Sequence, residues 1–140
     1  MSHTLQDLTE LLLNAARKSG ADDADAMAIQ GQSLSINVRG GQLEQAERAE
    51  GIDIGLRVLI GQRQASVSAS DINASTISEM AERAVAMANE APIDPYIGLA
   101  DCDALAQSWD IAALELCDPT PEPSPDALQN DAKQAEQAAL

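Results

Sequence analysis

Few residues of this chain have the chemistry of a catalytic centre. Its 140 residues include one histidine, His3, and two cysteines, Cys102 and Cys117. A serine nucleophile needs a base such as histidine, and a zinc site needs three or four nitrogen, sulfur or carboxylate ligands. Several serines lie between positions 66 and 78, but His3 is the one imidazole that could activate any of them. The sequence therefore predicts no catalytic residue, no metal ligand, and thiols that are buried or idle.

Three arginines near the central glycines are the candidate contact residues: Arg39, Arg57 and Arg63. A guanidinium group there can bind the carboxylate of a peptide or of a partner protein, pair with an acidic residue across strands, or remain in solvent. Structural pairing is the favoured interpretation, and substrate contact is the alternative. The acidic residues available for pairing are Glu44, Glu47 and Asp53.

The acidic run Asp22-Asp23-Ala24-Asp25 is a candidate for a cation site. A calcium loop needs a set spacing of oxygen ligands, a central glycine and a terminal bidentate glutamate. The run has none of these features, so it is predicted to be a solvated turn between a helix and a strand.

Alternating apolar residues punctuated by glycine predict antiparallel strands joined by hairpins. Gly40-Gly41 and Gly61-Gln62 are the predicted turns, and the strongest strand runs between residues 52 and 60. Apolar residues before Gly31 lie in odd phase and those after it in even phase, which predicts a bulge or bend there. The polar stretch from Leu43 to about Arg48 is either an exposed edge strand or a helical turn. We expect about four strands in a meander.

Two helices are predicted to cover one face of that sheet. The first runs from about Thr4 to Ser19, with a capping box formed by Thr4 and Asp7 and with Gly20 at its end. The second begins near Ala74, where Asp71 or Asn73 can cap it, and ends at Pro92. Their apolar stripes match the even-phase strand residues Ile54, Leu56 and Val58. The expected fold is α/β of the α+β type.

Proline separates this predicted domain, residues 1–117, from the end of the chain. Four of the eight residues at 118–125 are proline, so they form a stiff spacer. Residues 126–140 are predicted to form a helix that starts near Ser124. This helix has no stop signal, which suggests that the chain is truncated and that the helix can associate with a second copy.

The formal net charge is −15, and residues 101–140 hold nine acidic residues against Lys133 alone. Binding to nucleic acid or to an anionic membrane surface requires clustered basic residues, so neither partner is expected. No basic targeting segment and no apolar run near the ~20 residues of a membrane span is visible. The sequence predicts a cytoplasmic protein.

A set of short segments in fixed order resembles the N-terminal domain of the TldD/PmbA family. They are Gly20-Ala21-Asp22, Arg39-Gly40-Gly41, Gly51-Ile52-Asp53-Ile54-Gly55-Leu56-Arg57-Val58, Gly61-Gln62-Arg63 and Ala65-Ser66-Val67-Ser68. Residues 91–101 are most similar to the PmbA (TldE) branch, and residues 136–140 are similar to the end of a helix that precedes the family's next strand.

The resemblance implies one subunit of a cytoplasmic zinc peptidase that acts on unfolded or modified peptides, in microcin maturation and antitoxin turnover. The zinc-binding HExxxH segment of the family belongs to the TldD-like partner subunit, and nothing here matches it. This chain is then a noncatalytic domain whose sheet edge can pair with extended peptides. The alternative is an acidic interaction module that binds a basic protein surface and modulates DNA gyrase.

Overall fold

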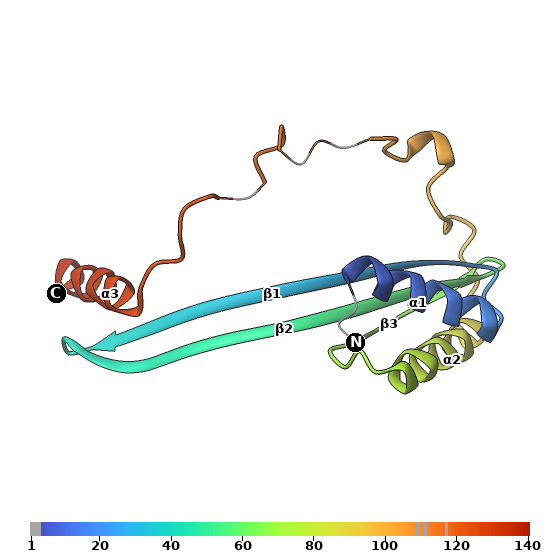
Figure 1. Ribbon diagram of the computed structural model, residues 1–140. Helices are drawn as coiled ribbons and strands as arrows, with labels where there is room; N and C mark the ends of the chain where they lie inside the picture. The colour runs from blue at the N-terminus through green and yellow to red at the C-terminus, as the bar shows by residue number, and fades with distance from the viewer. Residues whose placement is uncertain (1–3, 109, 111, 117) are drawn as a thin grey trace. The chain divides into compact units, whose positions relative to one another are not determined.

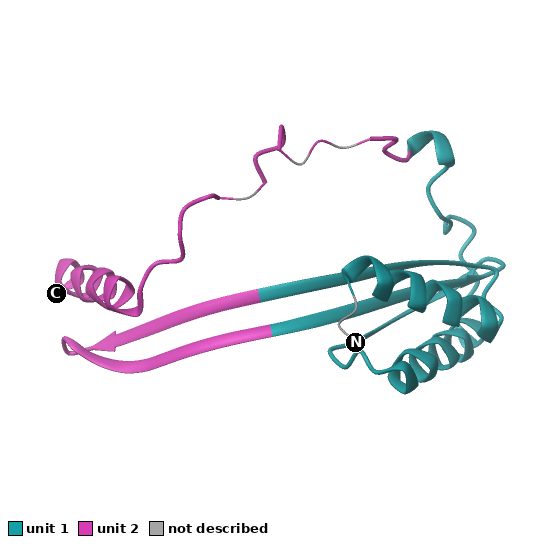
Figure 2. Ribbon diagram, in the orientation of Figure 1, with its two compact units in different colours: residues 1–31, 51–104 teal, residues 32–50, 105–140 magenta. Residues whose placement is uncertain are grey.

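A computed structural model describes residues 4–108, 110, 112–116 and 118–140. The chain divides into two compact units (Figure 2). The first combines Met1–Gly31 with Gly51–Ala104, and the second combines Gln32–Glu50 with Leu105–Leu140. His3 lies outside the described residues, as do Trp109 and Ile111.

Three strands form one sheet in the order β1-β2-β3: β1 is Asp23–Arg39, β2 is Gln42–Ile60 and β3 is Arg63–Ala69. β2 and β3 are antiparallel, with register from Ile54 opposite Ala69 to Ile60 opposite Arg63. Gly40, Gly41 and Gly61 have φ values of 58°, 72° and 54°. These values lie in the left-handed region that glycine tolerates, and both predicted hairpin turns are confirmed.

The prediction of about four strands is wrong, because the sheet has three. β2 continues through Gly51 and includes the polar stretch Gln42–Glu50, all of which is exposed. Main-chain hydrogen bonds hold a strand to its neighbour whether or not its side chains are apolar. The weak apolar alternation is therefore that of an exposed part of one long strand. Among the described residues, Gln42–Glu50 form no element separate from β2.

β1 also continues through Gly31, where a bulge or bend was predicted. Its core-facing residues before that glycine are alanines, Ala24, Ala26 and Ala28, in the same even phase as the residues that follow it. Met27 and Ile29 are more than half exposed on the opposite face. The predicted change of phase at Gly31 rested on the large side chains Met27 and Ile29, but in this part of β1 the small alanine side chains face the core.

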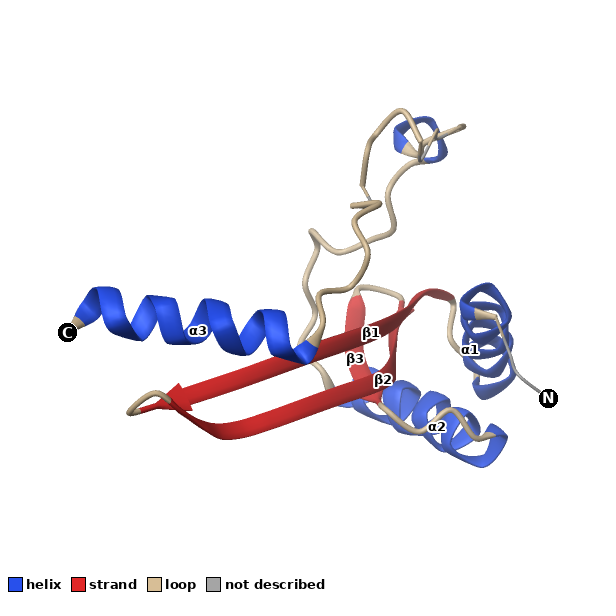
Figure 3. Cartoon of the chain, turned by 60° about the vertical axis from the view of Figure 1, so that its left-hand side comes forward, coloured by secondary structure: helices blue, strands red, loops and turns tan. Residues whose placement is uncertain are grey.

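Both predicted helices are present and pack on one face of the sheet (Figures 1 and 3). α1 is Leu5–Ser19, with the capping box of Thr4 and Asp7 and with Gly20 in the left-handed conformation at its end. α2 is Ala74–Glu90; Asn73 is at its N-cap position but makes no capping bond with its side chain. The core joins both helices to the even-phase residues of β2: Leu8, Leu12, Ala16, Ile54, Leu56, Val58, Ile77, Met80, Ala81, Ala84 and Ala88.

The second unit contains the far part of the β1-β2 hairpin, residues 32–50, which we call the arm. α3, Pro125–Ala139, lies beside the arm in this unit (Figure 1). Ser124 caps α3 by accepting a hydrogen bond from the Ala127 N–H, which confirms the prediction that this helix starts near Ser124. Leu128, Ala132 and Glu136 are half-buried and recur every four residues, so one stripe of α3 is covered.

Candidate functional site

The candidate site in the first unit is a shallow hollow on the sheet face opposite the helices. Its volume is about 460 Å³. Gly55 has no side chain, and those of Ser66 and Ser68 are small, so this space stays open, and Met27 borders it from β1. The hollow is lined by Asp25, Met27, Gly55, Leu56, Arg57, Ser66, Val67 and Ser68.

Arg57 is the charged centre of this hollow. Its Nε donates to both carboxylate oxygens of Asp25, at 3.0 and 3.2 Å, and its Nη2 contacts Asp25 Oδ2. Its Nη1 donates to Gln64 Oε1 at 3.4 Å. The hydrogen bonds to Asp25 raise the pKa of Arg57 above its usual value. The guanidinium is thus held in one orientation by a forked, charge-assisted pair.

Asp25 was not among the predicted partners of the arginines. It belongs to the acidic run that was predicted to be a solvated turn, and that prediction is wrong in part. Asp25 pairs with Arg57, and Asp22 Oδ2 accepts a hydrogen bond from the Gly61 N–H at 2.7 Å. The cross-strand placement of Asp25 and Arg57 follows from the unbroken length of β1 and β2, whereas the sequence predicted a bulge or bend at Gly31 and a separate element before Gly51.

Arg39 and Arg63 are held by structural contacts. Arg39 pairs with Glu44 at 2.9 Å, and Glu44 is one of the three acidic partners predicted for the arginines. The Arg39 side chain is nevertheless 80% exposed. Such a pair contributes about 0 to 1 kcal/mol. Arg63 Nη1 donates to the carbonyl oxygens of Asn89 and Ala91, both at 2.7 Å. A cation at the C-terminal end of α2 complements the partial negative charge there.

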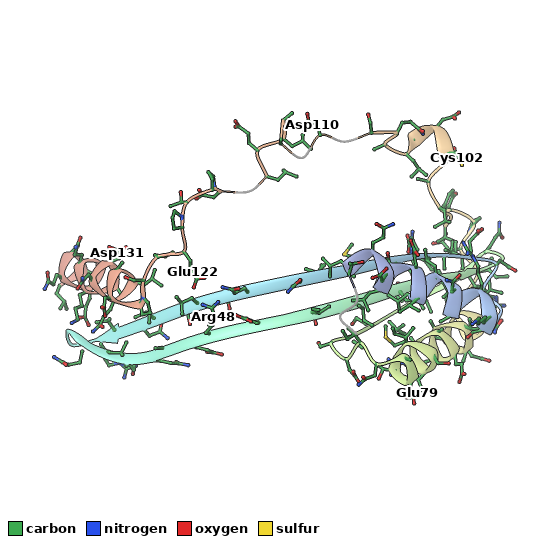
Figure 4. The ribbon with its side chains drawn as sticks, in the orientation of Figure 1. Arg48, Glu79, Cys102, Asp110, Glu122 and Asp131 are labelled. Atoms are coloured by element: carbon green, nitrogen blue, oxygen red, sulfur yellow. The ribbon has the colours of Figure 1, made fainter. Side chains whose placement is uncertain are left out.

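The second unit contains a further set of polar contacts that sequence reasoning missed. Glu122 accepts from Gln32 Nε2 and from Arg48 Nη1, both at 2.8 Å (Figure 4). Glu136 accepts from the N–H groups of Gly40 and Gly41, at 2.6 and 2.7 Å. Both glutamates come from the end of the chain and bind the arm. No local pattern indicates contacts across 74 to 96 positions.

The described residues contain no group of three or more histidine, cysteine, aspartate or glutamate side chains placed to hold a metal ion. Cys102 is exposed, while His3 and Cys117 lie outside the described residues. The donor set therefore does not fit a zinc centre in the described part of the chain. No helix described here is long and apolar enough to cross a lipid bilayer.

A second concavity lies between α1 and α2, with a volume of about 990 Å³. Its walls include Leu11, Ala15, Ile72 and Val85, and Lys18 and Glu82 also line it. The charges are of both signs, so the groove has no electrostatic preference for one kind of ligand.

Residues 24–88 match the family model described as PmbA/TldA metallopeptidase domain 1. This match, together with the two relatives described next, shows that the chain is similar to the PmbA/TldD family.

Its relatives carry PmbA and TldE names. The chain is 32% identical to the Metalloprotease PmbA homolog of Haemophilus influenzae and 32% identical to Metalloprotease PmbA of Escherichia coli O157:H7. These alignments cover 97% and 94% of this chain but only 29% and 28% of those proteins.

Two solved structures share the fold. TldE from Thermococcus kodakarensis has a TM-score of 0.71 at 17% identity, covering 94% of this chain and 29% of the other. A putative modulator of DNA gyrase from Bacteroides thetaiotaomicron has a TM-score of 0.69 at 16% identity, covering 76% of this chain and 24% of the other. The predicted resemblance to the family is confirmed.

Proposed function

We propose that this chain is a noncatalytic, peptide-handling domain of a two-subunit zinc peptidase of the PmbA/TldD family. The catalytic zinc belongs to a TldD-like partner subunit, and the substrates are unfolded or modified peptides in the cytoplasm. Microcin precursors and antitoxins are the substrate classes that the family resemblance suggests.

The observation that carries this proposal is the open edge of β2. β3 pairs with β2 only from Ile54 onward. Among the described residues, no strand lies beside Gln42–Glu50 on that side, and all nine residues are exposed. An extended peptide can add to such an edge through main-chain hydrogen bonds, whatever its sequence. This property suits a protein that handles many unfolded peptides.

Arg57 is the arginine that we propose for peptide contact. It lies in a hollow with space beside it, and Asp25 holds its orientation. A peptide carboxylate could bind its remaining N–H groups. Arg39 and Arg63 are assigned to the structural contacts described above.

Reconstitution tests the proposal. The full-length protein that contains this domain is combined with a TldD-like subunit, and cleavage of an unfolded peptide is followed with added zinc or chelator. We expect cleavage that needs both subunits and stops with chelator. Full activity of the TldD-like subunit alone would overturn the proposal.

The alternative function, an acidic module acting on DNA gyrase, is favoured by the charge of the chain and by the name of one structural neighbour. In this case binding to gyrase should be direct and should weaken strongly as salt increases. Titration of gyrase with the chain at low and high salt separates the two functions.

A further inference from the structure

We infer that the outer edge of β2 over Gln42–Glu50 is a docking surface for an extended segment rich in lysine or arginine. The inference rests on the proposed peptide-handling function and specifies both the place on the domain and the chemistry of the peptide. It follows from three properties of the second unit: the edge of β2 over residues 42–50 has no neighbouring strand among the described residues, all nine of these residues are exposed, and acidic side chains outnumber basic ones.

The edge is long enough for specific recognition. β2 is central in the sheet order, and its pairing with β3 begins only at Ile54. Nine residues of strand span about 30 Å at ~3.3 Å per residue. Sheet edges are commonly protected from pairing by charged side chains, lysine above all, by proline or by a covering element. Residues 42–50 include no lysine and no proline, and all are exposed.

The charge of this edge selects the peptide. Residues 42–50 contain Glu44, Glu47 and Glu50 against Arg48 alone. Arg48 donates to Glu50 and to Glu122, both at 2.8 Å, and these contacts raise its pKa, with the hydrogen bond to Glu50 as the largest cause. Its charge is therefore compensated twice, while Glu47 accepts a hydrogen bond from the neutral Gln45 amide at 3.3 Å.

The rest of the unit has the same sign of charge. The second unit holds ten acidic side chains against three basic ones. Opposite charges on neighbouring strands attract across about 5 Å, and like charges repel. The other edge of the arm, on β1 from Gln32 to Arg39, has no acidic residue, and its one charged side chain, Arg39, pairs with Glu44. The acidic residues of β2 therefore attract a basic strand more strongly than β1 does.

The test uses the full 140-residue chain without any partner subunit. The probe is a nine-residue peptide of alternating lysine and valine with blocked ends and a fluorescent label. We expect saturable binding by anisotropy and slower hydrogen exchange of amides within residues 42–50. The same peptide with glutamate in place of lysine should not bind.

N-methylation separates strand pairing from simple charge attraction. Methyl groups on two adjacent central residues block both edges of the peptide and should abolish binding. The same two groups placed two residues apart block one edge only and should leave binding largely intact. Equal binding of the two methylated peptides would overturn the inference, as would binding of the glutamate peptide.

A pair of charge reversals locates the surface. Glu47→Lys should weaken binding of the lysine peptide about 2- to 30-fold, since one attraction of about 0.2 to 1 kcal/mol becomes a repulsion. Glu79→Lys on α2 is the matched control, because it changes the charge equally at an exposed position of the first unit (Figure 4). An equal loss in both variants would contradict the assigned location.

The peptide-binding test and the reconstitution with a TldD-like subunit can fail independently of each other. Absence of peptide binding together with peptidase activity that needs both subunits would overturn this inference and support the proposed function. Binding as described together with a TldD-like subunit that is fully active alone would overturn the proposed function and support the docking surface.

Discussion

Single side chains in the first unit act mainly by completing main-chain hydrogen bonding at the ends of elements. Arg63 binds two carbonyl oxygens at the end of α2, and Asp71 binds the first turn of the same helix. The ends of a helix leave main-chain groups without intrahelical partners, so these residues stabilise α2 from both sides.

Replacing Arg63 should therefore destabilise the end of α2. Arg63→Ala removes two charge-assisted hydrogen bonds, and we expect a loss of about 1 to 3 kcal/mol in the free energy of unfolding. Arg63→Lys keeps the charge but replaces the planar guanidinium that places Nη1 between the two carbonyl oxygens, so its stability should lie between those of the wild type and Arg63→Ala. Urea titration measures the three proteins, and an unchanged midpoint in Arg63→Ala would refute this role.

Asp71 gives a pH-dependent prediction. The hydroxyl of Thr76 and the N–H groups of Asn73 donate to its carboxylate and lower its pKa below the ordinary 3.8. A group with a lowered folded-state pKa stabilises the protein above its unfolded-state pKa, and this contribution is lost as pH falls through the folded-state pKa. In the variant Asp71→Asn, the amide oxygen can still accept a hydrogen bond, but the side chain does not titrate.

The stability difference between the wild type and Asp71→Asn should therefore be constant near neutral pH and should decrease below about pH 4. Urea titrations of both proteins between pH 2 and 7 measure it, and the remaining carboxylates cancel in the difference. A difference that stays the same down to pH 2 would show that the Asp71 carboxylate makes no such contribution.

At the scale of elements, the two helices and the sheet depend on one apolar layer. Leu56 is 2% exposed in the centre of that layer. Leu56→Ala should cost about 2 to 5 kcal/mol through lost burial and the cavity left behind. Met27→Ala is the control, because Met27 is 62% exposed on the other face of the same sheet. Thermal melting of both variants measures the effect, and similar melting temperatures would contradict this arrangement of the core.

The docking of α3 on the arm depends on the carboxylate of Glu136. Glu136→Gln removes its charge and one of the two acceptors used by Gly40 and Gly41, a loss of about 1 kcal/mol. Hydrogen exchange over residues 127–138 should become about five-fold faster. Asp131→Asn, at an exposed position of α3, is the matched control and should leave the rate unchanged.

In the wild-type protein, the same amides should exchange faster than those of residues 52–60. A 15-residue helix is marginal without packing, and only one stripe of α3 is covered. Equal protection of the two segments in a dilute monomer would contradict this order of stability.

At the scale of the whole molecule, the shortage of metal ligands leads to a prediction about zinc. The nitrogen and sulfur ligands in the sequence are His3, Cys102 and Cys117, and the described residues contain no metal-binding cluster. The purified chain should therefore retain much less than one zinc per molecule after dialysis, and it should not cleave peptides. Elemental analysis measures the metal, with a TldD-like subunit carrying HExxxH as the positive control. One tightly held zinc per chain would show the prediction to be wrong.

The sequence by itself determined the helices, the hairpin turns and the core-facing residues of β2. The capping box at Thr4, the left-handed glycines and the apolar stripe of α2 act over a few neighbouring residues, so their signals are local. Only the tertiary structure decided how far the strands extend. Continuous pairing carries β1 through Gly31 and β2 through Gly51 without any apolar requirement.

The contacts of the candidate sites were also decided by the tertiary structure. Arg57 meets Asp25 across 32 positions, and Glu136 reaches Gly40 across 96. The sequence has 23 acidic residues, so local spacing alone did not show which of them pairs with each arginine. The length of the strands and the return of the chain select among those partners, and neither property is contained in a local pattern of residues.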